Sequence, residues 1–180
     1  MAILGVDDFK SKLVGGGARA NLFKATINFP AYAGGDVELT SFLCKTAALP
    51  ASNVAMIPIP FRGRQLKIAG DRVFEPWTIT IINDVNSSIR DSFERWMNGI
   101  NQHNANTGLT NPTDYQADMV VEQLNKAGDV TKRYDFRGAF PTNISEIAVS
   151  YDAENAIEEF TVTLEYQYWE SNNKPCKSYE

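Results

Sequence analysis

A strict two-residue period of hydrophobic side chains is the feature that most limits how this chain can fold. The clearest case runs from Phe160 to Tyr168, where large apolar or aromatic residues alternate with threonine, glutamate and glutamine. Successive side chains of a β-strand point to opposite faces, so this pattern predicts a strand with one buried face. The same alternation recurs in segments 23–29 and 77–81. The chain is therefore predicted to be mainly β.

Five further segments predict strands: residues 37–46, 65–69, 117–124, 130–140 and 147–151. The pair Gly70-Asp71 is expected to end the strand at 65–69. Segments 117–124 and 130–140 are separated by a short polar stretch, which predicts a hairpin. In the second of them, Tyr134, Phe136 and Phe140 are expected to share one face. Together these segments predict an antiparallel β-sandwich or open barrel of eight or nine strands.

One flanking α-helix is predicted to cover the sheets. Its apolar positions fall on a single helical face: Ile89, Phe93, Trp96, Met97 and Ile100. Ser87 or Ser88 is the expected N-cap residue, and Asp91 lies in the first turn, where the helix dipole favours an anion. We expect this aromatic face to pack on a sheet.

A proline-containing segment is predicted to project from the sheets. Residues 54–61 are apolar but include Pro58 and Pro60. Proline has no N–H to donate to a neighbouring strand, so it is confined to edges, bulges and loops. We expect this stretch to lie outside the core.

The overall charge and composition exclude several classes of protein. The 180 residues include 17 lysines and arginines against 22 aspartates and glutamates, a net charge of −5, whereas nucleic-acid-binding domains are usually basic. No apolar stretch approaches the roughly 20 residues of a membrane-spanning helix, and no signal peptide is evident. Cys44 and Cys176 suggest no disulfide framework, which fits a reducing compartment. We expect one soluble domain that is made inside the cell.

Motifs for catalysis are nearly absent. His103 is the only histidine, so a Ser-His-acid triad would have no other base. No spacing typical of a metal site or a phosphate-binding loop occurs. Glu158 and Glu159 are adjacent and would point to opposite faces of a strand. We therefore expect no enzyme activity, no cofactor, no metal and no small-molecule substrate.

A carbohydrate-binding β-sandwich stays open as an alternative of another class. Its stacking platforms would be Trp77, Tyr115 or Trp169. Trp77 lies in an alternating apolar pattern, which favours a place in the core instead.

Charge is distributed unevenly along the chain. Residues 146–170 contain seven carboxylates and no lysine or arginine, a net charge of −7. Residues 62–72 contain three arginines and Lys67 against Asp71, a net charge of +3. Patches of opposite sign can match across the subunits of an oligomer, although two ordinary solvated surfaces would give the same counts.

Six short motifs, in order over residues 20–170, resemble the tail tube proteins of contractile-tailed (myovirus-type) bacteriophages. They are Ala47-Ala48-Leu49-Pro50, Ala69 to Phe74 with Trp77, Asn83-Asp84, Phe93 with Trp96, Gly138 to Ile144, and Tyr166 to Glu170. The Asn-rich segment 101–112 and the tail after Glu170 depart from the family pattern.

The resemblance implies a virion structural protein. Six copies would form a ring with a β-lined channel, and stacked rings would form a tube that conducts viral DNA into the host after sheath contraction. The implied partners are further copies of the chain, the sheath protein, the baseplate and tail-terminator proteins, and DNA held without sequence specificity. Assembly would take place in the host cytoplasm. The tube of a bacteriocin or of a type VI-like injection system is the alternative within the same class.

The glycine run at residues 15–17 would break any helix, so residues 1–20 are predicted to form a flexible N-terminal arm. The resemblance then implies a tail tube domain over residues 21–170 and a C-terminal tail over residues 171–180. The proline-containing segment would reach the next ring. The residues expected to make that inter-ring contact are Met56, Ile57, Ile59, Phe61, Arg62, Arg64 and Arg72.

Overall fold

The structure is a computed structural model that describes residues 5–13 and 17–171. The helices are α1 (Val6–Lys12), α2 (Val37–Leu43), α3 (Ser88–Ile100) and α4 (Pro112–Tyr115). The strands are β1 (Phe23–Ile27), β2 (Cys44–Ala47), β3 (Asn53–Phe61), β4 (Arg64–Val73), β5 (Trp77–Ile82), β6 (Ala117–Leu124), β7 (Val130–Ile144), β8 (Glu159–Glu165) and β9 (Tyr168–Ser171). Cys176 and the first residues of the predicted arm lie outside the described residues.

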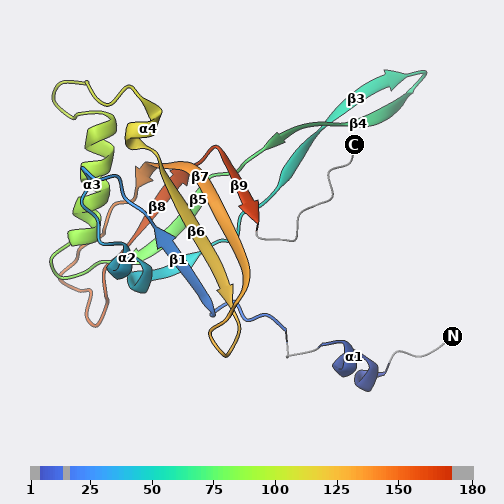
Figure 1. Cartoon of the computed structure of the whole chain (residues 1–180), viewed down its shortest axis with the longest axis horizontal. Coiled ribbons are helices and arrows are strands. Elements are labelled where there is room, and N and C mark those ends of the chain that lie inside the picture. The colour runs from blue at the N-terminus through green and yellow to red at the C-terminus, as the bar shows by residue number, and fades with distance from the viewer. Residues whose placement is uncertain (1–4, 14–16, 172–180) are drawn as a thin grey trace.

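Two packed sheets share the long strand β7 (Figure 1). The first sheet has the order β1-β6-β7-β9, and the second has the order β7-β8-β5-β2. Every neighbouring pair is antiparallel. The predicted fold class, a mainly β antiparallel sandwich or open barrel, is confirmed. Strands β3 and β4 pair only with each other, and form a ribbon that extends away from both sheets.

A bulge at Gly138 allows β7 to serve both sheets. Gly138 has a φ of +62°, a backbone conformation that favours glycine, and the pairing register with β6 shifts by one residue here. Phe136 and Ala139 are therefore both fully buried, while Phe140 is only partly buried. The expectation that Phe140 shares a face with Phe136 is wrong, because the extra residue reverses the alternation.

The core fills the space between the sheets and continues under α3. Every second residue of β5 and β8 is buried, in agreement with the predicted alternation. Phe93 and Trp96 of α3 are fully buried, and Phe29 meets both of their rings edge-on. The Trp96 Nε1–H donates a hydrogen bond of 2.7 Å to the carbonyl oxygen of Tyr115, which satisfies its buried donor. The flanking helix is thus confirmed, with its aromatic face inward.

Ser87 is the N-cap residue of α3, in agreement with the prediction, but its side chain does not cap the helix. Ser87 has a φ of +53° and forms no capping hydrogen bond through its side chain. Instead, the carboxylate of Asp84 accepts hydrogen bonds from the Ser88 hydroxyl at 2.8 Å and from the Ser88 backbone N–H at 3.2 Å. Asp84 therefore supplies the hydrogen bonds that an N-cap side chain usually forms.

The prediction of a strand over residues 37–46 is wrong for its first seven residues, which form α2. The carboxylate of Asp36 accepts hydrogen bonds from the backbone N–H groups of Glu38 and Leu39, as an N-cap does. Leu39 and Leu43, one turn apart, pack against the core. The cap and this burial override the strand preference of the valine, threonine and phenylalanine in the segment.

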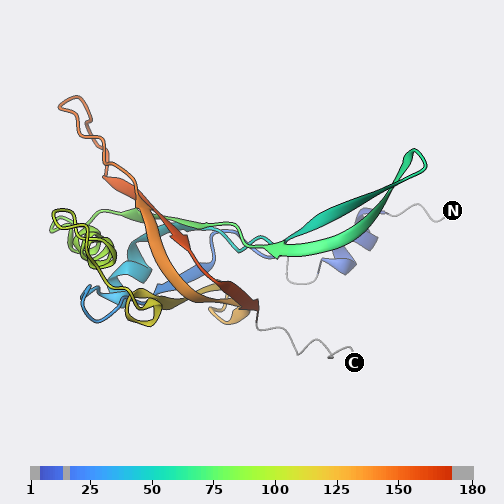
Figure 2. The same ribbon diagram turned by 90° about the horizontal axis from the view of Figure 1, so that it is seen from above.

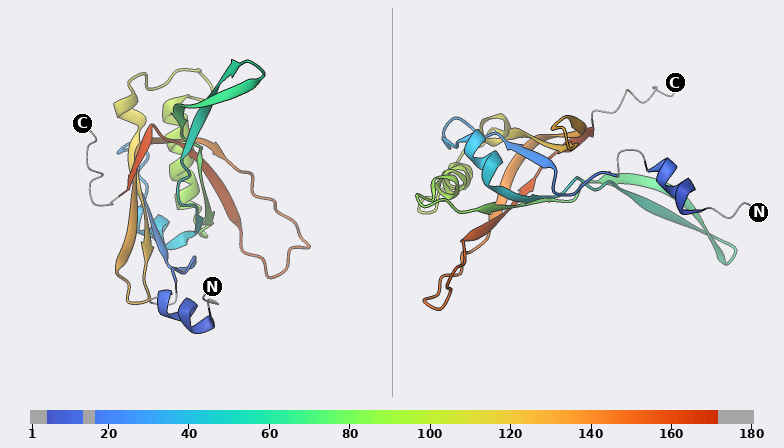
Figure 3. Two further views of the ribbon diagram at one scale, coloured as in Figure 1. Left: turned by 90° about the vertical axis from the view of Figure 1, so that its right-hand side faces the viewer. Right: turned by 90° about the horizontal axis from the view of Figure 1, so that it is seen from below.

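The predicted strand at 147–151 is also wrong. Residues 145–158 form a long loop between β7 and β8, which projects from the domain in Figure 3. Val149 and Tyr151 are exposed, so their spacing reflects no buried face. Two smaller differences concern strand ends: β4 continues through Gly70-Asp71 to Val73, and the last predicted strand is divided into β8 and β9.

Candidate assembly surfaces

The ribbon formed by β3 and β4 carries more exposed large apolar residues than any other segment of the described chain. Its tip is a two-residue turn in which Arg62 and Gly63 have φ values of +44° and +78°. Positive φ at both central residues identifies a type I′ turn, which matches the twist of antiparallel strands. Pro58 and Pro60 lie within β3, which is possible because both strands of the ribbon are edge strands. The prediction of a projecting proline-containing segment is therefore confirmed.

The pairing register divides the ribbon into two different faces. Ile57, Ile59 and Phe61 lie opposite Ile68, Leu66 and Arg64 respectively, and these six residues form what we call the apolar face. The other face carries the following residues: Val54, Met56, Pro58, Pro60, Gln65, Lys67, Ala69 and Arg72. The ribbon is almost wholly exposed on both faces. All seven residues predicted for inter-ring contact lie in the ribbon. Two of them, Met56 and Arg72, lie on the other face, away from Phe61.

A second exposed segment, residues 145–158, carries charge of the opposite sign, and we call it the acidic loop. Its carboxylates are all exposed: Glu146, Asp152, Glu154 and Glu158. The loop also exposes Val149, Tyr151 and Ile157, and Tyr151 is fully accessible. The ribbon and the acidic loop leave the domain at opposite ends of its long axis (Figure 2).

The outer face of the first sheet carries a network of ion pairs. Arg133 lies 2.8 Å from Asp135 and 3.4 Å from Glu122 on the neighbouring strand. Arg137 pairs with Asp118 and, at 3.4 Å, with Glu170. Hydrogen bonds to Asp135 and to Asp118 raise the pKa values of Arg133 and Arg137 above their ordinary value.

With Lys24, which lies opposite Glu122 on β1, the outer face holds three cations and four carboxylates, a net charge of −1. Each arginine is already bound by two carboxylates of its own chain. The face is therefore charged but offers little free positive charge to a ligand.

Both edges of the first sheet are open in the described part of the chain. Strand β1 pairs only with β6, and β9 pairs only with β7. A groove beside β1 is bordered by α2, and its lining includes Phe23, Thr26 and Phe42. Phe42 is 80% exposed, although it is a large aromatic residue. Sequence reasoning missed Phe42, because the segment was predicted as a strand; the helix-capping position of Asp36 was the available signal.

The residues considered for catalysis or carbohydrate binding do not converge. His103 is exposed in the loop after α3, and its backbone N–H is bonded to the Asn98 side chain. Trp77 is buried, with its Nε1–H donating to the Ala48 carbonyl oxygen at 2.7 Å. Tyr115 and Trp169 pack edge-on against Phe140 and Tyr134. The described residues hold no group of three potential metal ligands.

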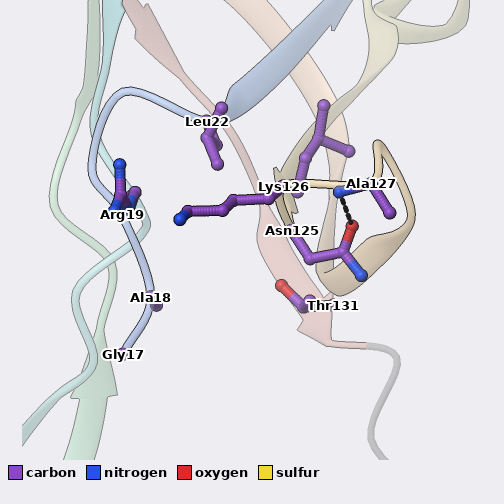
Figure 4. A pocket seen from close by; sticks show the side chains of 9 residues that line it. Gly17, Ala18, Arg19, Leu22, Asn125, Lys126, Ala127 and Thr131 are labelled. Carbon is purple, nitrogen blue, oxygen red and sulfur yellow. Dashed lines mark hydrogen bonds between the residues drawn. The ribbon is translucent and has the colours of Figure 1, made fainter. Parts of the chain in front are cut away.

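A shallow pocket lies where the segment before β1 meets the turn between β6 and β7 (Figure 4). Arg19 and Lys126 contribute charged groups to its lining, which contains no carboxylate. Asn125 shapes the turn, because its side-chain oxygen accepts hydrogen bonds from the backbone N–H groups of Ala127 and Asp129. The pocket thus offers no acid–base pair for catalysis.

Cys44 is a buried thiol rather than a reactive one. Its Sγ lies 3.5 Å from the carbonyl oxygen of Thr46, and burial raises the pKa of Cys44 to about 11. None of the helices in the described ranges has both the length and the apolar character required to cross a membrane.

Comparison with known proteins gives consistent matches over most of the chain. The family model described as phage tail tube protein matches residues 18–172. The tail tube protein gp19 of Enterobacteria phage T4 is 39% identical over 155 residues, which cover 85% of this chain and 91% of that protein. A tail tube protein of Serratia phage KSP90 is 33% identical over 166 residues, which cover 89% of this chain and 93% of that protein.

Solved structures share the fold at lower identity. A chain in the anti-feeding prophage baseplate superposes with a TM-score of 0.65 at 14% identity, and the match covers 86% of this chain and 95% of that chain. A chain in the sheath-tube complex of an extracellular contractile injection system gives a TM-score of 0.57 at 15% identity, and the match covers 89% of this chain and 95% of that chain. These two likenesses concern the fold alone.

Proposed function

This chain belongs to the phage tail tube protein family, a family of structural proteins and not of enzymes, and we propose that six copies close into a ring whose stacking builds the tube. The observation that carries the ring is the pair of open edges on the first sheet. An open edge exposes unpaired N–H and C=O groups and invites uncontrolled pairing. A closed ring of sheets covers every such edge with a neighbouring copy.

The groove beside β1 supports this arrangement. Phe42 stands exposed at one lateral edge of the first sheet, next to the strand that would meet the neighbour. Large exposed aromatic residues are typical of surfaces that a partner covers. In the ring, Phe42 is buried against the adjoining subunit.

The outer face of the first sheet is proposed as the channel wall. Because the two open edges belong to this sheet, continuing it through neighbours places its charged face on one side of a closed barrel. Arg133 and Arg137 are neutralised by carboxylates of the same chain, so a DNA backbone would find few free cations. Phosphate contacts dominate the affinity of proteins for DNA, and their scarcity would let DNA pass without being held.

The ribbon is proposed as the element that stacks one ring on the next. It buries none of its apolar side chains within its own chain. The residues involved would be those predicted from the sequence: Met56, Ile57, Ile59, Phe61, Arg62, Arg64 and Arg72. Residues 1–20 would act as an arm and residues 171–180 as a tail around the tube domain of residues 21–170.

The assembled tube would be a part of the virion, surrounded by sheath protein and bounded by baseplate and tail-terminator proteins. In this role it would conduct viral DNA after contraction of the sheath. Structures of a baseplate and of a sheath-tube complex contain chains of the same fold, which supports this set of partners. The match to the phage family and to phage relatives favours DNA over protein as the cargo.

Negative-stain electron microscopy of the purified chain over a concentration series tests the proposal. Six-fold rings at low concentration and hollow tubes at high concentration are expected. Monomers throughout the series, or rings of another symmetry, would contradict it.

A further inference from the structure

The ribbon and the acidic loop carry charged side chains that form no ion pair among the described residues. The ion pairs of the described residues involve none of the ribbon's cations and none of the loop's carboxylates. We propose that the ribbon of one copy docks on the acidic loop of a second copy in the next ring. This inference rests on the proposed stacking of rings and adds the identity of the receiving surface.

Both segments also expose apolar side chains that a shared contact would cover. The loop presents Val149, Tyr151 and Ile157, which are between 72% and 107% exposed. The ribbon presents Phe61, 66% exposed, among the other residues of its apolar face. Burial of apolar surface stabilises a contact. Apolar burial thus supplies affinity, and the opposite charges select the partner.

The positions of the two segments suit a contact between stacked copies. The ribbon and the loop lie at opposite ends of the long axis, and both rise on the side away from β1 and β6 (Figure 2). They therefore do not meet within one chain. A copy displaced along the long axis brings its loop toward the ribbon of the first. Because the two contacting surfaces differ, the association is head-to-tail and continues indefinitely, as a tube requires.

The pairing register of β3 and β4 indicates which face of the ribbon docks on the loop. Arg64 is the cross-strand partner of Phe61 and lies on the same apolar face. Arg62 occupies the turn beside them. Lys67 lies on the other face, opposite Pro58. Docking through the apolar face therefore places the tip arginines against the loop. Asp152 and Glu154, which follow Tyr151 in the loop, are their expected partners.

A charge exchange between the two segments tests this pairing. One variant carries Arg62→Glu and Arg64→Glu, a second carries Asp152→Arg and Glu154→Arg, and a third carries all four substitutions. Ring and tube formation by each full-length chain is followed by electron microscopy and sedimentation. Each double variant should form rings but require roughly tenfold more protein, or more, to form tubes, because like charges then face each other. The fourfold variant should recover tubes, because the ion pairs re-form with reversed polarity.

Matched controls separate the pairing from a general effect of charge. Lys67→Glu, on the other face of the ribbon, should disturb tubes much less than Arg64→Glu. Glu94→Arg with Asp114→Arg, on α3 and α4, gives the same charge change as the loop variant and should leave tubes intact. Circular dichroism confirms that every variant is folded.

Three outcomes would overturn the inference. If the fourfold variant fails to recover tubes although both double variants lose them, the ribbon docks elsewhere. If the loop variant stacks normally but loses binding to purified sheath protein, the acidic loop is a sheath contact instead. If wild-type rings form but never stack, the proposed stacking fails together with this pairing, whereas a chain that stays monomeric contradicts the proposed function itself.

Discussion

Ile59 on β3 lies directly opposite Leu66 on β4, and both side chains remain exposed at 42% and 60%. Cross-strand apolar pairs stabilise a sheet when a further layer covers them. An isolated two-stranded hairpin is only marginally stable in water. This pair therefore indicates that the ribbon completes its structure by contact with another molecule.

Phe61→Asp should stop the stacking of rings without preventing their formation. Burial of a phenylalanine side chain stabilises a contact by about 1.5–3 kcal/mol, so tubes should require roughly ten to more than a hundred times more protein. Sedimentation of the variant over a concentration series measures the shift. Val54→Asp, on the other face of the ribbon and outside the proposed contact residues, is the matched control. Tubes of normal length from Phe61→Asp at wild-type concentration would refute the role of the ribbon.

Phe42→Ser should weaken ring closure while leaving the subunit folded. Phe42 is largely exposed in the single chain, so its removal creates no cavity in the core. The thermal midpoint of the monomer should stay within the range of ordinary surface substitutions. Size-exclusion chromatography with light scattering should show a shift from hexamer to monomer. Hexamers unchanged at low protein concentration would exclude Phe42 from the subunit contact.

Neutralising the carboxylates around Arg137 should make the channel retain DNA. In a chain with Asp118→Asn and Glu170→Gln, Arg137 keeps neither of its partners. The freed guanidinium can contact phosphate, and such contacts weaken steeply as salt rises. Tubes of the variant should bind duplex DNA at low salt and release it at high salt. A chain with Asp114→Asn and Glu94→Gln changes the net charge equally and should bind no more DNA than the wild type.

Asp84→Ala should lower the free energy of unfolding by about 1 kcal/mol, the typical value of a helix cap. Burial alone would raise the pKa of Asp84, but the hydrogen bonds from Ser88 and Ile89 lower it below its ordinary value. A lowered pKa means that the stabilisation is present above the ordinary value and is lost as the pH falls through the folded value. Urea titrations should thus show that the free energies of unfolding of the wild type and of Asp84→Ala converge below pH 4. A difference in the free energy of unfolding that stays constant down to pH 2 would contradict the role of the Asp84 carboxylate as the helix cap.

The Cys44 thiol should resist modification until the protein unfolds. Its folded pKa of about 11 lies above the ordinary value of 9.0, so the free energy of unfolding should fall as the pH rises between these two values. Cys44→Ala should remove this part of the pH dependence. Alkylation followed by mass spectrometry measures the reactivity, with urea-unfolded protein as the control. Rapid labelling of Cys44 at pH 8 in the folded chain would contradict its burial.

The strands with a regular two-residue period could be predicted from the sequence, because the alternation of apolar and polar residues follows from the burial of one face. Strands β5, β6 and β8 and helix α3 are examples. The errors occur where local contacts oppose the pattern. Residues 37–43 contain good strand formers, but the Asp36 cap and the packing of Leu39 and Leu43 make them helical. In the acidic loop, Val149 and Tyr151 continue the alternation that begins at Ile147, but no sheet buries them.

The assembly surfaces were predictable only in part. Pro58 and Pro60 correctly indicated a projecting segment, since proline is unsuited to a central strand. The division of the ribbon into two faces depends on its register, which the type I′ turn at Arg62 and Gly63 determines. The ion pairs of Arg137 join residues far apart in the chain, so no local pattern could reveal them.

The ribbon contributes no residue to the buried core. Substitutions there can alter partner choice at little cost to folding, whereas core substitutions cannot. Two related chains produced in one cell could keep separate tubes by diverging in the ribbon and in the acidic loop alone. The same separation makes these two segments a practical place to engineer subunits that copolymerise in a fixed order.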